Sequence, residues 1–300
     1  MSAAGNPALN TAARPAGGGR RLSLSWIGVV PFFLYVGLFL LLPTAIIVVG
    51  SFTAPKGGLS LTNFGGIDKP YIVKAFTLSL SVSAVSAVAG ALLGALLAYA
   101  VVTGNPTGLL RRSIMSASGV LAQFGGVALA FAFIATISTV GFVYIFLKDH
   151  GIDVYAKGVW FYEAPGITLV YLYFQIPLMV LVFLPALDGI RPQWREATQS
   201  LGGSTWHYWR HVAGPLLAPA FLGCTLLLFA NAFSAYATVA ALLTNGGVYL
   251  PLQIQALLTG ETEQSQPGLA QALALTMILI VVVVMTLYTL LLRRTTRWLR

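Results

Sequence analysis

Charged residues are scarce in this sequence: 8% of its 300 residues are charged, whereas 57% are hydrophobic. A soluble domain carries charge on about a quarter of its residues, so the composition predicts a protein of the membrane. Cysteine is scarcer still, because Cys224 is the one cysteine of the chain. A single cysteine excludes intrachain disulfides and cysteine-based metal clusters, and we interpret Cys224 as a small packing residue.

Motifs for energy use and catalysis are missing as well. A P-loop needs a lysine before serine or threonine, and the five lysines precede Gly, Pro, Ala, Asp and Gly. The predicted spans contain no ionisable residue, which argues against ion-coupled transport by this chain alone. We therefore expect no catalytic residues, no bound cofactor and no enzyme activity.

Histidine offers no metal site either. His207 and His211 have the i, i+4 spacing that could clamp a metal ion on one helix face, but no third ligand lies nearby. We expect a solvated or interface role for this pair, and no metal. The basic residues form no stripe or recognition motif, so we expect no nucleic-acid binding.

Six long stretches without charge indicate membrane-spanning helices, since about 20 apolar residues cross the hydrocarbon core. A turn signal at Asn245-Gly246-Gly247, followed by Pro251, predicts a short interfacial piece and not a seventh span. The fold class that follows is an all-α polytopic membrane protein. The six spans are expected near residues 27–50, 75–101, 114–141, 166–187, 216–243 and 269–292.

The basic residues predict which side of the membrane each loop faces. Twelve arginines share one side and five lysines the other, with two and six acids, so the net charges are 12 − 2 = +10 and 5 − 6 = −1. The positive-inside rule places the first side, with both termini, in the cytoplasm. We expect a disordered cytoplasmic tail over residues 1–25, a membrane domain over 26–292 and a basic cytoplasmic end over 293–300.

One cytoplasmic segment, residues 188–215, concentrates charged and aromatic side chains between the fourth and fifth spans. Pro192 favours a helix start, and Gly202-Gly203 favours a helix end. Ser204 or Thr205 can then cap a second helix, which we expect to run to Pro215.

The second helix of this segment carries residue types that are common in protein interfaces. Trp206, Trp209 and Arg210 fall at i, i+3 and i+4, which places them on one face. The alternative is an amphipathic hairpin on lipid headgroups, where tryptophan and arginine are also common.

The register of the segment resembles the EAA loop of binding-protein-dependent ABC importer permeases. Glu196-Ala197 begins the pattern, Gly202 follows six residues after the glutamate, and Pro215 stands thirteen residues after that glycine. Three positions depart from the family pattern: Thr198, Val212 and Gly214. The resemblance extends over about residues 26–292 and implies the type I ABC importer permease (MetI-like) fold.

The resemblance also implies partners. They are separate ABC ATPase subunits that bind ATP and magnesium, a second permease subunit in a heterodimer, and an external substrate-binding protein, all at the bacterial inner membrane. Glu196 is expected to hydrogen bond to the ATPase, Ala197 and Leu201 to pack into its cleft, and Gly202 to allow the turn. The residues expected at the ATPase contact are Glu196, Ala197, Leu201, Gly202, Trp206 and Pro215.

A permease of this kind forms half of a translocation path, which the few polar groups of the spans should line. The candidates are Gln123, Gln175, Asn231, Ser234, Tyr236 and Thr238. We expect Asn231, Ser234 and Thr238 on one helix face, with interhelical hydrogen bonding as the alternative role. The sequence is most similar to spermidine/putrescine permeases, so we expect a polyamine, with thiamine, ferric iron, sulfate or aminoethylphosphonate as alternatives.

Two other function classes stay open. An ATP-independent channel or carrier would move its substrate without ATPase subunits. A membrane scaffold would use the cytoplasmic hairpin to recruit a partner of another kind.

Overall fold

The computed structural model of the chain describes residues 25–54, 57–104, 108–156, 158–243, 248–260 and 266–296. These residues are helical apart from turns and loops, and no β-strand occurs among them. The chain divides into two compact units, residues 1–46 and 47–300. Residues 1–24 of the expected tail and residues 297–300 of the expected basic end lie outside the described ranges, and Ser25 begins the first helix.

Unit 1 contributes a single apolar helical run. It consists of α1, Ser25–Val36, a π-helical turn, Gly37–Leu41, and the beginning of α2, Leu42–Ser51. Residues Val29–Ser51 are long and apolar enough to cross a membrane. This helix corresponds to the first predicted span.

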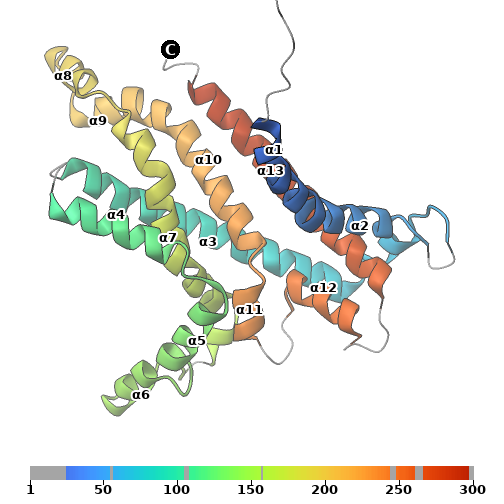
Figure 1. Ribbon diagram of the computed structural model, residues 1–300. Helices are drawn as coiled ribbons and strands as arrows, with labels where there is room; N and C mark the ends of the chain where they lie inside the picture. The colour runs from blue at the N-terminus through green and yellow to red at the C-terminus, as the bar shows by residue number, and fades with distance from the viewer. Residues whose placement is uncertain are drawn as a thin grey trace, which may run out of the picture. The chain divides into compact units, whose positions relative to one another are not determined.

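Unit 2 holds the remaining helices (Figure 1). They are α3 Pro70–Thr103, α4 Leu109–Leu121, α5 Gly126–Ile137, α6 Phe142–Asp149, α7 Ala164–Asp188, α8 Pro192–Ser200, α9 Thr205–Tyr208, α10 Gly214–Phe233, α11 Ala237–Leu242, α12 Leu250–Thr259 and α13 Pro267–Thr296. Five stretches of this unit could cross a membrane, which with the first makes six: Pro70–Thr103, Gly126–Asp149, Ala164–Asp188, Thr205–Phe233 and Pro267–Leu291. The predicted all-α fold with six spans is confirmed.

Two helices break inside predicted spans. The range 114–141 contains the end of α4 and the start of α5, and 216–243 contains the end of α10 and the start of α11. The Gly126 amide donates to the Thr238 hydroxyl over 3.0 Å, and the Tyr171 hydroxyl donates to the Ala235 carbonyl over 3.2 Å. Within a membrane such breaks are tolerated where neighbouring groups satisfy the freed backbone, as they do here.

The centre of unit 2 is the contact between α3 and α7, the most extensive contact between two helices. Along α3, buried small residues recur at every fourth position: Ser86, Gly90, Gly94 and Ala98. A Cβ atom on Gly94 would lie 2.5 Å from the Cβ atom of Met179, so the two backbones approach closely. Small residues of this kind are how membrane helices pack tightly.

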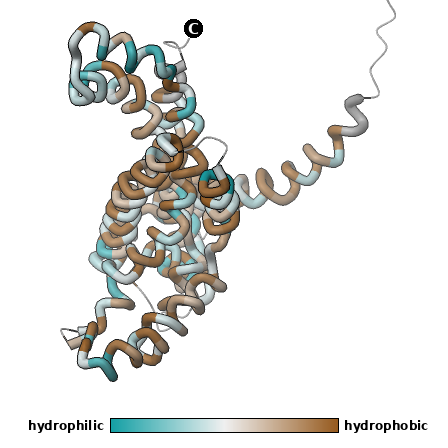
Figure 2. The backbone as a smooth tube through the Cα atoms, turned by 90° about the vertical axis from the view of Figure 1, so that its left-hand side faces the viewer, coloured by the Kyte–Doolittle hydropathy of each residue, from teal (hydrophilic) through white to brown (hydrophobic). Residues whose placement is uncertain are grey.

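Around this pair, α10 packs against both α3 and α13, and α12 packs against α13 and α3. The Leu250 amide at the start of α12 donates to the Ser79 hydroxyl of α3 over 2.8 Å. With ten residues α12 is too short to cross a bilayer, so it matches the short piece expected after the fifth span. Figure 2 shows mainly hydrophobic residues along the long helices and hydrophilic ones toward their ends.

Candidate functional site

Residues 188–215 lie at one end of unit 2. Figure 1 shows α8 and α9 beyond the ends of α7 and α10, and the C-terminal part of α13 reaches the same end. Hydrophilic residues are frequent in this segment (Figure 2). Its position fits a surface that meets a partner outside the membrane.

The first helix of the segment begins and ends as predicted. Pro192 occupies the first turn of α8, where its missing N–H costs no hydrogen bond. Beyond the end of α8, the Gly202 amide donates to the Gln199 carbonyl over 2.9 Å. The Gly203 amide donates to the Thr198 carbonyl over 2.9 Å. This pair of bonds is a Schellman motif, which needs the left-handed backbone that Gly202 adopts with φ +78°.

The second helix starts as predicted but does not stop. The Ser204 hydroxyl accepts a hydrogen bond from the amide three residues on, which confirms Ser204 as the N-cap. α9 continues through a π-helical turn, Trp209–Ala213, into α10, so the prediction that the helix ends at Pro215 is wrong. The proline has no N–H and its ring would clash with a regular preceding turn, and the wider π turn accommodates it.

The six residues expected at a partner contact are all exposed on this segment: Glu196, Ala197, Leu201, Gly202, Trp206 and Pro215. Leu201 is 89% exposed and Trp206 is 69% exposed. Within the described ranges, the carboxylate of Glu196 takes part in no ion pair. Two apolar anchors beside a free carboxylate give the segment the chemistry of a docking surface.

The expected face of Trp206, Trp209 and Arg210 is divided in the structure. Trp206 and Arg210 are exposed, whereas Trp209 is half-buried. The ring of Trp209 meets the ring of Tyr99 on α3 edge to face, with centroids 5.3 Å apart. The ring contact holds Trp209 against α3, so within this chain the residue anchors the segment.

An ion pair that the sequence did not predict fixes the base of the segment. The guanidinium group of Arg111 on α4 lies 2.6 Å from the carboxylate of Asp188 at the end of α7. The two residues are 77 positions apart in the chain, and no local pattern links them. The sequence offered one indication of this ion pair: the two opposite charges lie on the same, basic side of the predicted topology.

The residues expected along a translocation path differ in burial. Gln175 is fully buried and bonds to Ser86, and Thr238 is buried and bonds to the Gly126 amide. Four others are exposed: Gln123, Asn231, Ser234 and Tyr236. The expected face of Asn231, Ser234 and Thr238 does not exist, because α10 ends before Ser234 and Thr238 belongs to α11.

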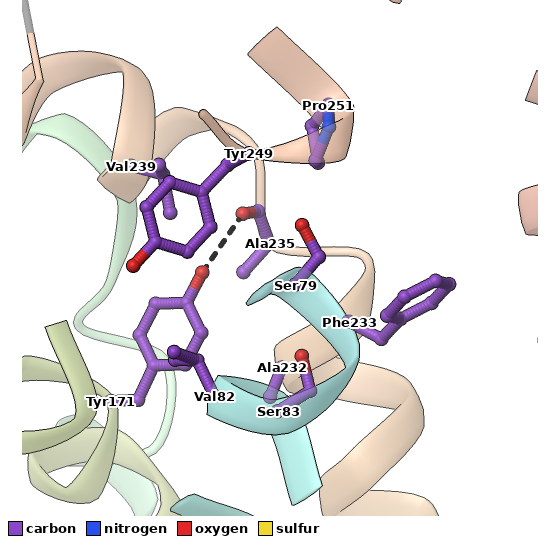
Figure 3. Close-up of a pocket in the computed structure, with 10 residues that line it drawn as sticks. All are labelled: Ser79, Val82, Ser83, Tyr171, Ala232, Phe233, Ala235, Val239, Tyr249 and Pro251. Atoms are coloured by element: carbon purple, nitrogen blue, oxygen red, sulfur yellow. Dashed lines mark hydrogen bonds between the residues drawn. The ribbon is translucent and has the colours of Figure 1, made fainter. Parts of the chain in front are cut away.

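A small cavity, whose polar lining side chains are Ser79, Ser83, Tyr171 and Tyr249, lies where α3, α7, α10, α11 and the start of α12 meet (Figure 3). Its volume is about 10 Å³, close to the space that one water molecule needs. Figure 3 shows the Tyr171 hydroxyl directed at Ala235 and the Tyr249 hydroxyl directed away from it. The Tyr249 hydroxyl is buried and has no partner in the described part of the chain.

The Tyr249 hydroxyl of this cavity stays protonated and therefore carries no charge. Burial, with a smaller contribution from the carboxylate of Glu163, raises the pKa of Tyr249 to about 12. The hydroxyl is therefore neutral at physiological pH. In this conformation the cavity has room for about one water molecule.

The solved structures that resemble this chain share its fold. A bacterial ABC transporter involved in the import of the acidic polysaccharide alginate matches with TM-score 0.66 and 16% identity, over 91% of this chain and 95% of that chain. The MetNI methionine ABC transporter, in inward-facing conformations, matches with TM-score 0.51 and 13% identity, over 74% of this chain and 95% of that chain.

Curated relatives are similar in sequence over shorter or weaker alignments. The thiamine transport system permease protein ThiP of Escherichia coli (strain K12) is 32% identical over 81 residues, which are 27% of this chain and 15% of that protein. The sulfate transport system permease protein CysT of Salmonella typhimurium is 26% identical over 209 residues, 69% of this chain and 70% of that protein. The match to ThiP therefore spans only a small part of that protein's length.

The family described as the inner membrane component of binding-protein-dependent transport systems matches residues 142–297. The matched range is more than half of the chain, and it contains the whole α8–α9 segment. In the described part of the chain, six helices are long and apolar enough to cross a membrane. This chain therefore belongs to the family of inner membrane components of binding-protein-dependent transport systems.

Proposed function

We propose that this chain forms half of the translocation path of an ATP-binding cassette importer and is driven by a separate ATPase subunit that docks on α8 and α9. The observation that carries the proposal is the exposed helix–turn–helix at one end of unit 2, with Glu196, Leu201 and Trp206 on its surface. ATP and magnesium bind to the partner ATPase, and no cofactor binds to this chain.

The continuous helix through α9 and α10 supplies a mechanical reason for the coupling. A partner that moves α9 also moves α10, because the π turn joins them without a loop. Coupling requires that the partner contact the segment differently in its two nucleotide states. The glutamate would hydrogen bond to the ATPase, and Ala197 and Leu201 would pack into its cleft.

We further propose that the α8–α9 end faces the cytoplasm, together with both termini. The arginines of this end, among them Arg111, Arg191, Arg195 and Arg210, support the orientation through the positive-inside rule. An external substrate-binding protein delivers the solute to the opposite end. The second permease subunit is a paralogue in a heterodimer.

For the substrate we propose a small solute that the binding protein selects. Our sequence prediction was a polyamine, but the relatives matched in sequence are named for thiamine and for sulfate. Thiamine and sulfate were already among the alternatives, with ferric iron and aminoethylphosphonate. A panel of binding proteins loaded with these solutes separates them, and ATPase activity rises only with the right pair.

The test of coupling is Glu196→Lys in the reconstituted complex. We expect the variant to insert in the membrane normally and to lose substrate-stimulated ATP hydrolysis, because the charge at the contact is reversed. Gln193→Lys, on the same exposed helix, is the control and keeps the stimulation. Full stimulation of Glu196→Lys, or flux from the purified chain without ATPase subunits, would refute the proposal.

A further inference from the structure

An open apolar groove lies beside the π turn that follows α9, and the proposed function does not use it. One wall is a face of α3 with Leu92, Leu96 and Tyr99, and the other is a face of α10 with Leu217 and Phe221. The groove encloses about 480 Å³, within the range of ~300–1,000 Å³ that is typical of small-ligand sites.

The lining is apolar except at one end. Tyr99 and Trp209 are the two lining residues whose side chains carry a polar atom. They belong to the end of the groove nearest α9, where their rings meet edge to face. Tyrosine and tryptophan gather at the headgroup level of bilayers, so this end of the groove lies at the membrane surface and the rest lies in the hydrocarbon core.

Positive charge stands beside the same end. The ring of Tyr208 packs edge to face against the groove residue Trp209, with centroids 6.0 Å apart, and Arg195 on α8 interacts electrostatically with the Tyr208 hydroxyl. Arg210 directly follows Trp209 in the chain, and both arginines are exposed. Neither forms an ion pair with any residue that the structure describes. The end of the groove nearest α9 therefore lies at the arginine-bearing end of unit 2, where Arg195 and Arg210 are exposed and available to an anion.

The walls favour a lipid chain over another helix. Where α3 packs on a helix, at α7, it presents Gly90 and Gly94, so that the backbones approach closely. Toward the groove it presents Leu92 and Leu96, which are 53% and 65% exposed and would hold a neighbouring backbone away. A flexible acyl chain adapts to such walls.

We propose that this groove binds an anionic phospholipid of the leaflet at the α8–α9 end, with one acyl chain between α3 and α10 and its phosphate beside Arg195 and Arg210. Basic side chains at the mouths of gaps between membrane helices attract anionic headgroups. The bound lipid contacts the base of the coupling segment at Trp209 and supports the placement of α8 and α9. Only the identity of the leaflet rests on the proposed function.

Native mass spectrometry of the chain purified with its bound subunits tests the proposal, with phosphatidylglycerol or phosphatidylcholine added. We expect phosphatidylglycerol to bind at least about fivefold more tightly than phosphatidylcholine. Arg195→Gln weakens phosphatidylglycerol binding about fivefold, because one basic side chain near the bilayer surface contributes about 1 kcal/mol. Ala218→Phe fills the groove and removes the bound lipid.

Matched controls keep both effects specific. Arg112→Gln removes an exposed arginine from α4, which contributes no residue to the groove, and leaves the binding unchanged. Leu222→Phe enlarges an exposed side chain of α10 outside the groove and also leaves it unchanged. Equal binding of the two lipids, or undiminished binding to Ala218→Phe, overturns the proposal.

Protein occupants of the groove give a different result. Cys224→Ser first removes the native cysteine. Disulfide crosslinking then pairs Leu96→Cys with a cysteine introduced in α1 or in the second permease subunit. An efficient crosslink to either would show that protein fills the groove, and it would overturn the lipid site. Substrate-stimulated ATP hydrolysis is measured on the same preparations. Its absence in the unsubstituted complex, with lipid binding intact, counts against the proposed function alone.

Discussion

The Nε2 atom of Gln175 donates a hydrogen bond to the Ser86 hydroxyl over 2.9 Å, inside the contact between α7 and α3. Gln175 is fully buried, and its Oε1 atom has no partner among the described residues. In this conformation the side chain of Gln175 forms a hydrogen bond between two helices. That is the alternative role that the sequence left open for the residues expected along the translocation path.

Substituting Ser86 and substituting Gln175 should therefore lower the free energy of unfolding by different amounts. Ser86→Ala leaves the whole Gln175 amide without a partner, and we expect it to lower the free energy of unfolding by about 1–2 kcal/mol. Gln175→Met keeps the length of the side chain and removes the unpaired oxygen, so its cost should be smaller. Thermal unfolding in detergent measures both. A Gln175→Met protein with unchanged stability but no transport would assign the residue to the path.

Gly94 is where the backbones of α3 and α7 leave least room. A Cβ atom there would lie 2.5 Å from the Met179 Cβ atom and 2.7 Å from the Ile176 carbonyl oxygen. We expect Gly94→Ala to separate the helices and to cost about 1–3 kcal/mol of unfolding free energy. Gly119→Ala on α4, where nothing lies within 4 Å, is the control and should be neutral or slightly stabilising. Equal stability of the two variants would contradict the packing described here.

The turn at Gly202 should matter for coupling and little for assembly. A side chain there meets open space, and φ +78° strains most residues other than glycine by about 1–2 kcal/mol, with aspartate among those that tolerate it better. We expect Gly202→Asp to insert in the membrane and to lose substrate-stimulated ATP hydrolysis, because it places a negative charge at the α8–α9 turn where the ATPase is proposed to dock. Ser200→Ala at the end of α8 is the control. Full stimulation in Gly202→Asp would speak against a role of this turn in coupling.

Replacing each of the two tyrosines of the small cavity by phenylalanine should change the stability of the protein differently. Tyr249→Phe removes a buried hydroxyl without a partner, so we expect unchanged or higher stability. Tyr171→Phe leaves the Ala235 carbonyl unpaired at the break between α10 and α11, and should cost about 1 kcal/mol. Thermal unfolding of both variants is the measurement. A clear loss of stability in Tyr249→Phe would mean that a water molecule in the cavity bonds to this hydroxyl.

The coupling segment was predictable because its signals are local. Pro192 at a first turn, Gly202 in a Schellman motif and Ser204 as an N-cap each act on backbone groups within a few residues. The error at Pro215 arose from the same local rule, since a proline usually ends a helix. A π turn before it, supported by the contact of Trp209 with Tyr99, carried the helix onward.

The surroundings of the residues expected along the path were not predictable, because they come from distant parts of the chain. The bond between Gly126 and Thr238 joins residues 112 positions apart, and the bond between Tyr171 and Ala235 joins residues 64 apart. These bonds place the helix breaks that separate Ser234 from Thr238. The sequence prediction assumed one unbroken helix over this span, so it could not include these breaks.

The sequence by itself determined the six apolar spans, the helix–turn–helix between the fourth and fifth, and the excess of arginine on one side. Hydropathy and capping depend only on a window of neighbouring residues, so they can be assigned without a fold. The tertiary structure alone decided where two spans break, that Gln175 joins α7 to α3, that Arg111 meets Asp188, and that α3 and α10 enclose a groove. Each of these depends on which distant side chains come into contact, and only the packed helices fix that.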